Sequence, residues 1–187
     1  MYKALVHSDV PFINNKQLWK MKVPLKIKIF SWYLRRGVIL TKDNLAKRNW
    51  QGSTKCVLCH HDENIMHLFF QCSFARSIWA AIQVASNLYP PSTVTNIFSN
   101  WLHGIDNTFR NRLRVGAIAL LWSLWLCRND RVFNAKLSSP MHVIFLCSLS
   151  PGVVYSSASG TPRPVYGGLL AVGASGERYF YPAWVAA

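Results

Sequence analysis

The chain has 187 residues, about one domain by the usual size of ~100–200 residues. It is 51% hydrophobic and 15% charged, so it can bury a core and is not a disordered chain by composition. The net charge of +14 favours a polyanionic partner, nucleic acid first and anionic membrane second. The seven acids are dispersed along the chain apart from one adjacent pair, which argues against two-metal phosphoryl chemistry and so against a nuclease or polymerase acting alone.

The cysteines and the apolar runs indicate a location inside the cell. Five cysteines is an odd number, and they are not spaced as a disulfide framework. No basic segment followed by an apolar one opens the chain, so we expect no signal peptide. The longest apolar run, 115–127, is short of the ~20 residues needed to span a bilayer. We therefore expect an intracellular, nuclear protein with no membrane partner, whose cysteines are thiols or metal ligands.

The first predicted elements are two short helices. Pro24 suits the first turn of a helix that Gly37 could end, although the alternation over 25–29 fits a strand equally well. Thr41 is a candidate N-cap for a second helix, with Leu45 and Ala46 facing inward.

Three further helices are expected. Ser73 is a candidate cap for a helix that ends before the prolines at 90–91, and another helix covers 94–103. The longest covers about 109–136. Its arginines at 110, 112 and 114 are interpreted as a solvated face, with a site for an anionic partner as the less favoured alternative. Its core face is expected to contain Leu121, Trp122, Leu124, Trp125 and Val132.

The composition changes between about 136 and 150. Residues 148–187 contain 6 of the 10 glycines and 4 of the 9 prolines, which is typical of loosely structured chain. The predicted fold is mainly α: a small helical domain, a long helix and a poorly structured C-terminal tail. The predicted divisions are a domain at 16–86, a helical extension at 94–136 and a low-order tail at 148–187.

One segment, 56–72, contains a cluster of cysteine and histidine residues that could act as ligands. Cys56, Cys59, His67 and Cys72 have the spacing C-x2-C-x7-H-x4-C, which places three thiols and one imidazole close together along the chain. These are a complete tetrahedral ligand set for one zinc ion, and a site with four protein ligands is structural rather than catalytic. The helical domain predicted at 16–86 is therefore expected to be zinc-binding and stabilised by zinc.

Two alternatives to this ligand set stay open. The C-x-x-C pair could be plain thiols or a redox motif, although a redox motif would be expected within a βαβ unit. His60 or His61 could replace His67 as the fourth ligand. The remaining cysteines, Cys127 and Cys147, lie in apolar stretches and are expected to be buried thiols.

The chain from about 16 to 85 resembles the zinc-binding domain that follows the polymerase in reverse transcriptases of plant LINE-type (non-LTR) retrotransposons. The resemblance is carried by Trp19, 22–32 (KVPLKIKIFSW), 40–41 (LT), 44–45 (NL), 48–50 (RNW), 56–59 (CVLC), 67–76 (HLFFQCSFAR) and Trp79. Residues 119–133 resemble the helical segment that commonly follows this domain.

This resemblance implies that Cys56, Cys59, His67 and Cys72 hold zinc, and that the parent polyprotein handles element RNA and target DNA. The chain departs from the parent, because it has no palm-type aromatic-Ala/Val-Asp-Asp motif and no endonuclease or RNase H carboxylate set. We therefore expect no enzymatic activity and no small-molecule substrate.

The N-terminal segment, 1–55, indicates a nucleic-acid partner, RNA or DNA. It contains 12 Lys or Arg against 2 acids, with tryptophans and a tyrosine between the cations, as backbone contact and base stacking require. The candidate contact residues are Lys20, Lys22, Lys26, Lys28, Arg35, Arg36, Lys47 and Arg48. The alternatives are a module that docks on another protein, and a retroelement fragment without a function of its own.

Overall fold

The computed structural model describes residues 16–148, and every named element in that range is a helix. The elements are α1 (Lys16–Lys20), α2 (Leu25–Arg35), α3 (Lys42–Ala46), η2 (His67–Gln71), α4 (Ser73–Ser86), α5 (Val94–Phe98), α6 (Asn107–Asn134) and α7 (Pro140–Ser148). The predicted mainly α class is confirmed. Among the described helices, none combines the length and the apolar character that crossing a membrane requires.

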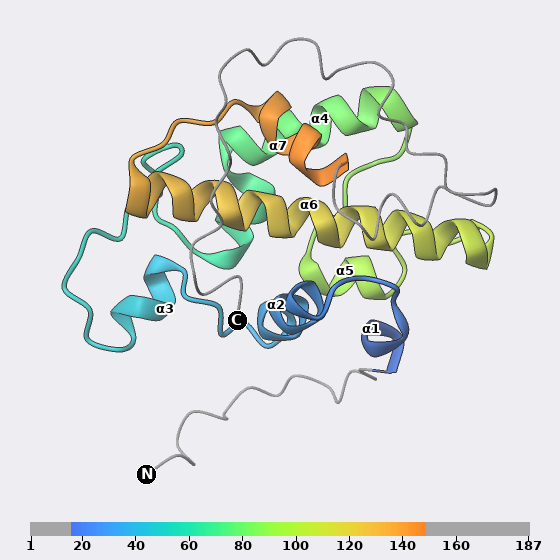
Figure 1. Cartoon of the computed structure of the whole chain (residues 1–187), viewed down its shortest axis with the longest axis horizontal. Coiled ribbons are helices and arrows are strands. Elements are labelled where there is room, and N and C mark those ends of the chain that lie inside the picture. The colour runs from blue at the N-terminus through green and yellow to red at the C-terminus, as the bar shows by residue number, and fades with distance from the viewer. Residues whose placement is uncertain (1–15, 149–187) are drawn as a thin grey trace. The chain divides into compact units, whose positions relative to one another are not determined.

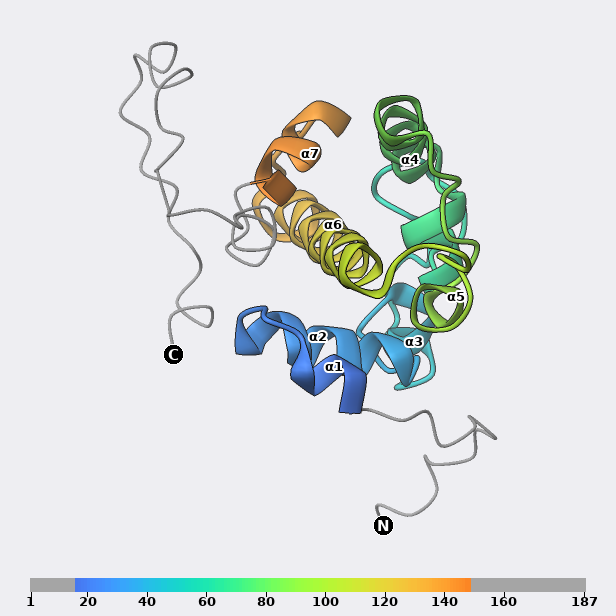
Figure 2. The ribbon, with the colours of Figure 1, turned by 90° about the vertical axis from the view of Figure 1, so that its right-hand side faces the viewer.

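The long helix α6 lies in the middle of the other helices (Figures 1 and 2). α2 and α5 contact it on one side, and α7 packs on the other side against both α6 and α4. α1 contacts α2. The core is thus built around α6, and most of the middle of that helix is buried.

α2 forms a helix because its apolar residues recur at helical spacing. Ile27, Phe30 and Leu34 are buried on one face, whereas a strand would place Ile27 on the face opposite to Phe30 and Leu34. Pro24 stands at the N-cap, and Gly37 follows the helix with a φ of +70°, which a residue without a Cβ adopts readily. The prediction of a helix between Pro24 and Gly37 is confirmed, and the strand alternative is wrong.

Thr41 occupies the N-cap position of α3 as predicted, but its hydroxyl donates to Asp43 Oδ1 rather than capping a backbone N–H, and the buried face of the helix is different. Lys42 and Asn44 are buried, whereas Leu45 is half-buried and Ala46 is exposed. The cause is polar: the backbone N–H of Lys42 donates to Glu63 Oε1 at 3.0 Å, and the side chain of Asn44 donates to the carbonyls of Gly37 and Ile39 at 2.7 and 2.8 Å. Hydrogen bonds, rather than apolar burial, place this short helix.

α4 begins one residue earlier than its predicted cap implies. Cys72 occupies the N-cap position, and Ser73 is the first helical residue. The helix stops at Asn87, whose φ of +54° is left-handed, before the prolines at 90–91 are reached. α5 is shorter than predicted, with Thr93 as its N-cap.

α6 confirms the predicted long helix. Asp106 caps it by accepting the backbone N–H groups of Thr108 and Phe109 at 2.8 and 3.2 Å. The interpretation of its first arginines as a solvated face is wrong for two of the three. Arg114 donates to the carbonyls of Ile97 and Ser99 at the end of α5, and Arg110 donates to the carbonyl of Ile105. Of these three arginines, only Arg112 is exposed and makes no such bond within the described residues.

An aromatic group joins three parts of the chain in the core. The ring of Phe30 in α2 lies edge-on to Phe69 in η2, with centroids 6.2 Å apart, and to Trp122 in α6 at 5.2 Å. Trp122 is buried, Trp125 is half-buried, and Leu121 and Leu124 are buried as predicted. Val132 is exposed, so its assignment to the core is wrong, since the last turn of α6 extends past the hydrophobic cluster.

The sequence did not predict α7. It lies between the expected end of the long helix and the expected tail, and its Val143 is fully buried. The division into a domain at 16–86 and an extension at 94–136 stays a prediction, and the two segments share one hydrophobic cluster. The predicted tail at 148–187 lies outside the described residues apart from Ser148.

Candidate metal centre

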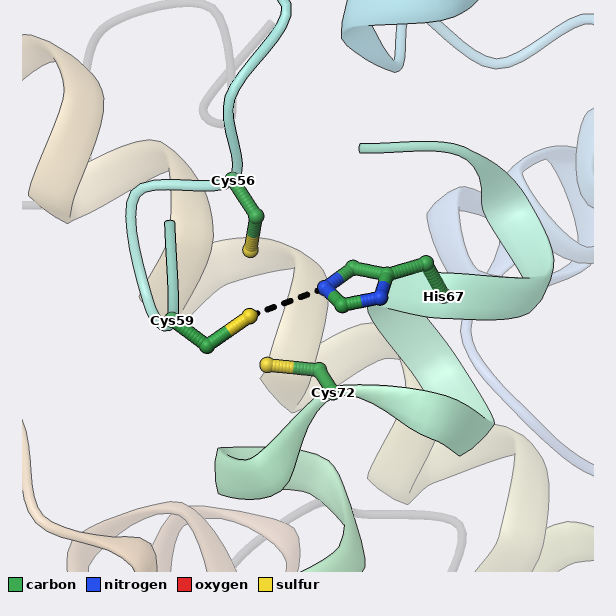
Figure 3. A group of neighbouring side chains, drawn as sticks. All are labelled: Cys56, Cys59, His67 and Cys72. Carbon is green, nitrogen blue, oxygen red and sulfur yellow. Dashed lines mark hydrogen bonds between the residues drawn. The ribbon is translucent and has the colours of Figure 1, made fainter. Parts of the chain in front are cut away.

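Four side chains from the segment between α3 and α4 converge on one point (Figure 3). The sulfurs of Cys56, Cys59 and Cys72 and a ring nitrogen of His67 all lie within 4.8 Å of one another. Around a zinc ion with Zn–S bonds of ~2.3 Å, tetrahedral sulfurs lie about 3.8 Å apart, so the cluster is of the right size for one ion. Three thiols and one imidazole are suited to hold one zinc, as the spacing predicted.

The first two ligands lie on a tight turn. The backbone N–H of His60 donates to the carbonyl of Cys56 at 2.9 Å, and that of Leu58 donates to the Cys56 sulfur at 3.4 Å. His60 has a φ of +67°, which reverses the chain after Cys59. Both sulfurs therefore face the same point, and an N–H···S bond supports the charge of a bound thiolate.

The other two ligands are brought together by the π-helical turn η2. The backbone N–H of Cys72 donates to the carbonyl of His67, five residues earlier, at 2.7 Å. In an α-helix residues five apart point in different directions, and the wider turn corrects this. The backbone N–H of His67 also donates to Asn64 Oδ1 at 2.8 Å, which fixes the start of the turn.

The protonation of the cluster suits a metal. Burial lowers the pKa of His67, which favours the neutral imidazole that binds zinc. A hydrogen bond between Cys56 and Cys72 lowers the pKa of Cys72, while the same bond, together with burial, raises the pKa of Cys56. The two thiols therefore differ in acidity, and zinc binding requires both of them to be deprotonated.

Among the described residues, no other cysteine or histidine joins this cluster. His60 and His61 are exposed, and the ring of His61 turns to the carbonyl of Cys59 at 3.2 Å. Burial raises the pKa of Cys127, and that of Cys147 to about 12, so both are held as thiols. Cys127 is buried as expected, and Cys147 is half-buried.

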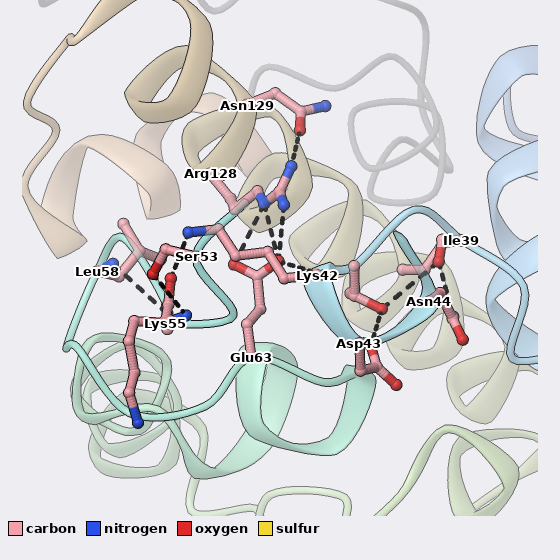
Figure 4. A network of polar contacts seen from close by, with 12 residues as sticks. Ile39, Lys42, Asp43, Asn44, Ser53, Lys55, Leu58, Glu63, Arg128 and Asn129 are labelled. Atoms are coloured by element: carbon pink, nitrogen blue, oxygen red, sulfur yellow. Dashed lines mark hydrogen bonds and ion pairs between the residues drawn. The ribbon is translucent and has the colours of Figure 1, made fainter. Parts of the chain in front are cut away.

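A buried ion pair that the sequence pattern did not predict supports the ligand loop (Figure 4). Glu63 is 0% exposed, and its carboxylate accepts Arg128 Nη2 at 2.7 Å and Nε at 3.2 Å. It also accepts the backbone N–H of Lys42. Glu63 therefore links the ligand segment between Cys59 and His67 to α3, through the backbone of Lys42, and to α6, through Arg128. The signal in the sequence was weak, since an acid in a polar loop is usually solvated.

The eight predicted nucleic-acid contacts are spread over α1, α2 and the segments that follow α1, α2 and α3. Six are exposed and two, Lys28 and Arg35, are half-buried. Lys28 donates to the carbonyl of Trp19 at 3.0 Å, and Arg35 lies over the ring of Phe98 at 4.4 Å. These two side chains hold α2 to α1 and α5. The exposed six are Lys20, Lys22, Lys26, Arg36, Lys47 and Arg48.

The fold and the ligands define a helical module with a structural zinc site of the Cys3His type. Residues 1–79 match the family model described as zinc-binding in reverse transcriptase, and this range contains all four ligands. The resemblance drawn from the sequence is thereby confirmed for the zinc-binding domain of reverse transcriptases.

A curated protein of Arabidopsis thaliana, whose name describes it as a putative ribonuclease H protein, is 27% identical over 86 residues. The similarity covers 43% of this chain and 14% of that relative, so the chain corresponds to a small part of its length. No solved structure matches the chain significantly.

Proposed function

We propose that this module binds nucleic acid through the exposed cations of α1, α2 and the turn after α3, in the context of a retroelement protein of the LINE type. The observation that carries the proposal is the distribution of charge. The segment 16–42 contains eight Lys or Arg and no acid, and four of these cations, Lys20, Lys22, Lys26 and Arg36, are exposed. The first described acid is Asp43. A surface of one sign raises the local concentration of phosphate and speeds association.

The aromatic residues near these cations support the proposal. Trp19 and Tyr33 are exposed on α1 and α2, and Arg36 lies over the ring of Trp32 at 4.2 Å. Exposed rings next to cations offer base stacking in addition to phosphate contact.

The acids of the module support a binding role rather than a catalytic one. Each of the five in the described range is engaged in a structural contact. Asp43 pairs with Lys47, Asp62 with Lys55 and Glu63 with Arg128, Asp106 caps α6, and Asp130 accepts from Asn134. We therefore infer that any chemistry of the parent protein lies in other domains, and that this module works in the nucleus as a binding unit.

The test is a salt-titrated binding assay with the full, zinc-loaded chain. Neutralising Z phosphates gives a log–log slope of about −0.9Z on duplex DNA and about −0.7Z on a single strand. Charge reversal of the exposed Lys20 and Lys22 is expected to weaken binding and to reduce the slope by about one for each phosphate that is no longer neutralised. The control reverses two arginines of α6, Arg112 and Arg131. The proposal would be contradicted if the Lys20/Lys22 variant and the Arg112/Arg131 control lost the same affinity, or if the affinity did not depend on the salt concentration.

A second function, docking on a protein, is favoured by one observation. The outer face of α2 exposes apolar side chains at successive turns, with Leu25 64% exposed and Ile29 and Tyr33 also accessible. Aliphatic groups neither stack on bases nor bind phosphate, whereas they would pack against a protein. Replacing Leu25 and Ile29 by serine should leave nucleic-acid binding unchanged if this face serves a protein partner.

A further inference from the structure

A groove along α4 lies beside the metal centre and outside the predicted contact residues. Its volume is about 580 Å3, within the ~300–1,000 Å3 of ligand sites, and it is open to solvent along one side. Five of its lining residues, Ser73, Arg76, Ser77, Ala80 and Gln83, recur at three or four residues and so form one face of the helix.

The walls of the groove are held in place. Phe70 of η2 stacks nearly parallel to Trp79, with ring centroids 6.3 Å apart, and the indole N–H of Trp79 donates to the carbonyl of Phe69 at 2.8 Å. The proline pair at 90–91 forms a further part of the wall, and the φ angles of these residues are fixed by their rings. The indole N–H of Trp101 anchors this wall by donating to the carbonyl of Tyr89 at 2.8 Å. A preformed site loses less entropy when a ligand binds.

The polar groups of the groove have unused hydrogen-bonding capacity. Within residues 16–148, the guanidinium of Arg76 has no ion pair or hydrogen bond, and the same holds for the side-chain amide of Gln83. α4 contains no acid that could neutralise Arg76. Arg76 can therefore offer a fork of donors to an anion.

We propose that this groove binds one nucleotide of a single-stranded nucleic acid. Arg76 holds the phosphate together with the hydroxyl of Ser73, and the base lies against Phe70 and Pro90, with the amide of Gln83 at its edge. A cation beside a flat apolar wall fits the two parts of a nucleotide. Bases inside a duplex are stacked and paired, so the groove prefers a single strand. The inference rests on the proposed function and adds strand selectivity at a second surface.

The experiment compares two ligands on the full, zinc-loaded chain at constant salt. The probes are a labelled single strand of about 12 thymidines, inside the usual site size of ~4–16 nucleotides, and a duplex of the same length. Arg76→Gln is expected to weaken single-strand binding about tenfold, the effect of removing one charge-assisted hydrogen bond, and duplex binding less than about twofold. Gln83→Ala should also lower single-strand affinity with little effect on the duplex.

The control is Arg112→Gln, which removes one exposed arginine of α6 and should change both affinities by less than about twofold. Zinc content and circular dichroism verify that each variant is folded. If Arg76→Gln lowers the affinity for both probes equally, or if Arg112→Gln causes the same loss, the groove is not a nucleotide site, whereas the proposed nucleic-acid binding still holds. Tighter binding of a phosphoserine peptide than of the single strand would also show that the groove is not a nucleotide site. If the unaltered chain binds neither nucleic acid, the proposed function itself fails.

Discussion

Replacing Arg128 by methionine should destabilise the protein strongly, because it leaves the carboxylate of Glu63 buried without its cation. Glu63 is 0% and Arg128 4% exposed, and the closest pair of atoms lies 2.7 Å apart. Removing one partner of such a pair costs about 3–5 kcal/mol, and a domain has only about 5–15 kcal/mol in total. Arg128→Met therefore removes a large part of the stability.

A double-mutant cycle separates this pair from ordinary packing. Glu63→Gln removes the charge but keeps an oxygen that can accept the backbone N–H of Lys42. The variant that carries both changes has no buried charge at this position, so its loss of stability should be smaller than the sum of the single losses by about 2 kcal/mol. The coupling then measures how firmly the ligand loop is held to α6.

Urea unfolding followed by circular dichroism, with zinc in excess, gives the free energies. Arg112→Met is the control, since Arg112 is exposed on the same helix and its replacement should change stability by less than about 0.5 kcal/mol. A loss below about 1 kcal/mol for Arg128→Met, or strictly additive single losses, would refute a buried pair of this strength.

Three further predictions concern the metal and the core. Cys59→Ser should release zinc and unfold the segment around it, because structural zinc supplies on the order of 10 kcal/mol of folding free energy, and unchanged metal content and circular dichroism would count against the site. Burial lowers the pKa of His67 below its usual 6.5, so the stability linked to this group is present above pH 6.5 and is lost as the pH falls through the lowered value; a loss of the folded circular dichroism signal that begins above pH 6.5 on acidification would contradict this. Phe30→Ala should cost about 3–5 kcal/mol in urea unfolding, since its ring contacts both Phe69 and Trp122, and a cost below about 1 kcal/mol would show that this ring does not join the helices.

The metal ligands could be predicted from sequence because their chemistry is local. All four lie between Cys56 and Cys72, and so short a segment can place the ligands in few ways. α2 and α6 were predictable for a similar reason, since their buried residues repeat with the helical period.

The missed features depend on contacts between distant segments. The partner of Glu63 is 65 residues away along the chain, and no spacing rule links the two. Lys42 and Asn44 are buried only because the ligand loop and the turn at Gly37 supply hydrogen-bond partners. α7 was hidden by its composition: it contains no Lys, Arg, Asp or Glu that would mark a polar face, so periodicity could not reveal it.

The zinc centre is part of the core rather than an appendage to it. η2 carries both His67 and Phe69, and Phe69 is fully buried against Phe30 of α2. The side of α2 that faces away from this core exposes Leu25 and Ile29. The position of that face is thus set by the turn that zinc holds, although no zinc ligand lies on it. A structural metal can in this way determine the geometry of a binding surface without contacting the partner.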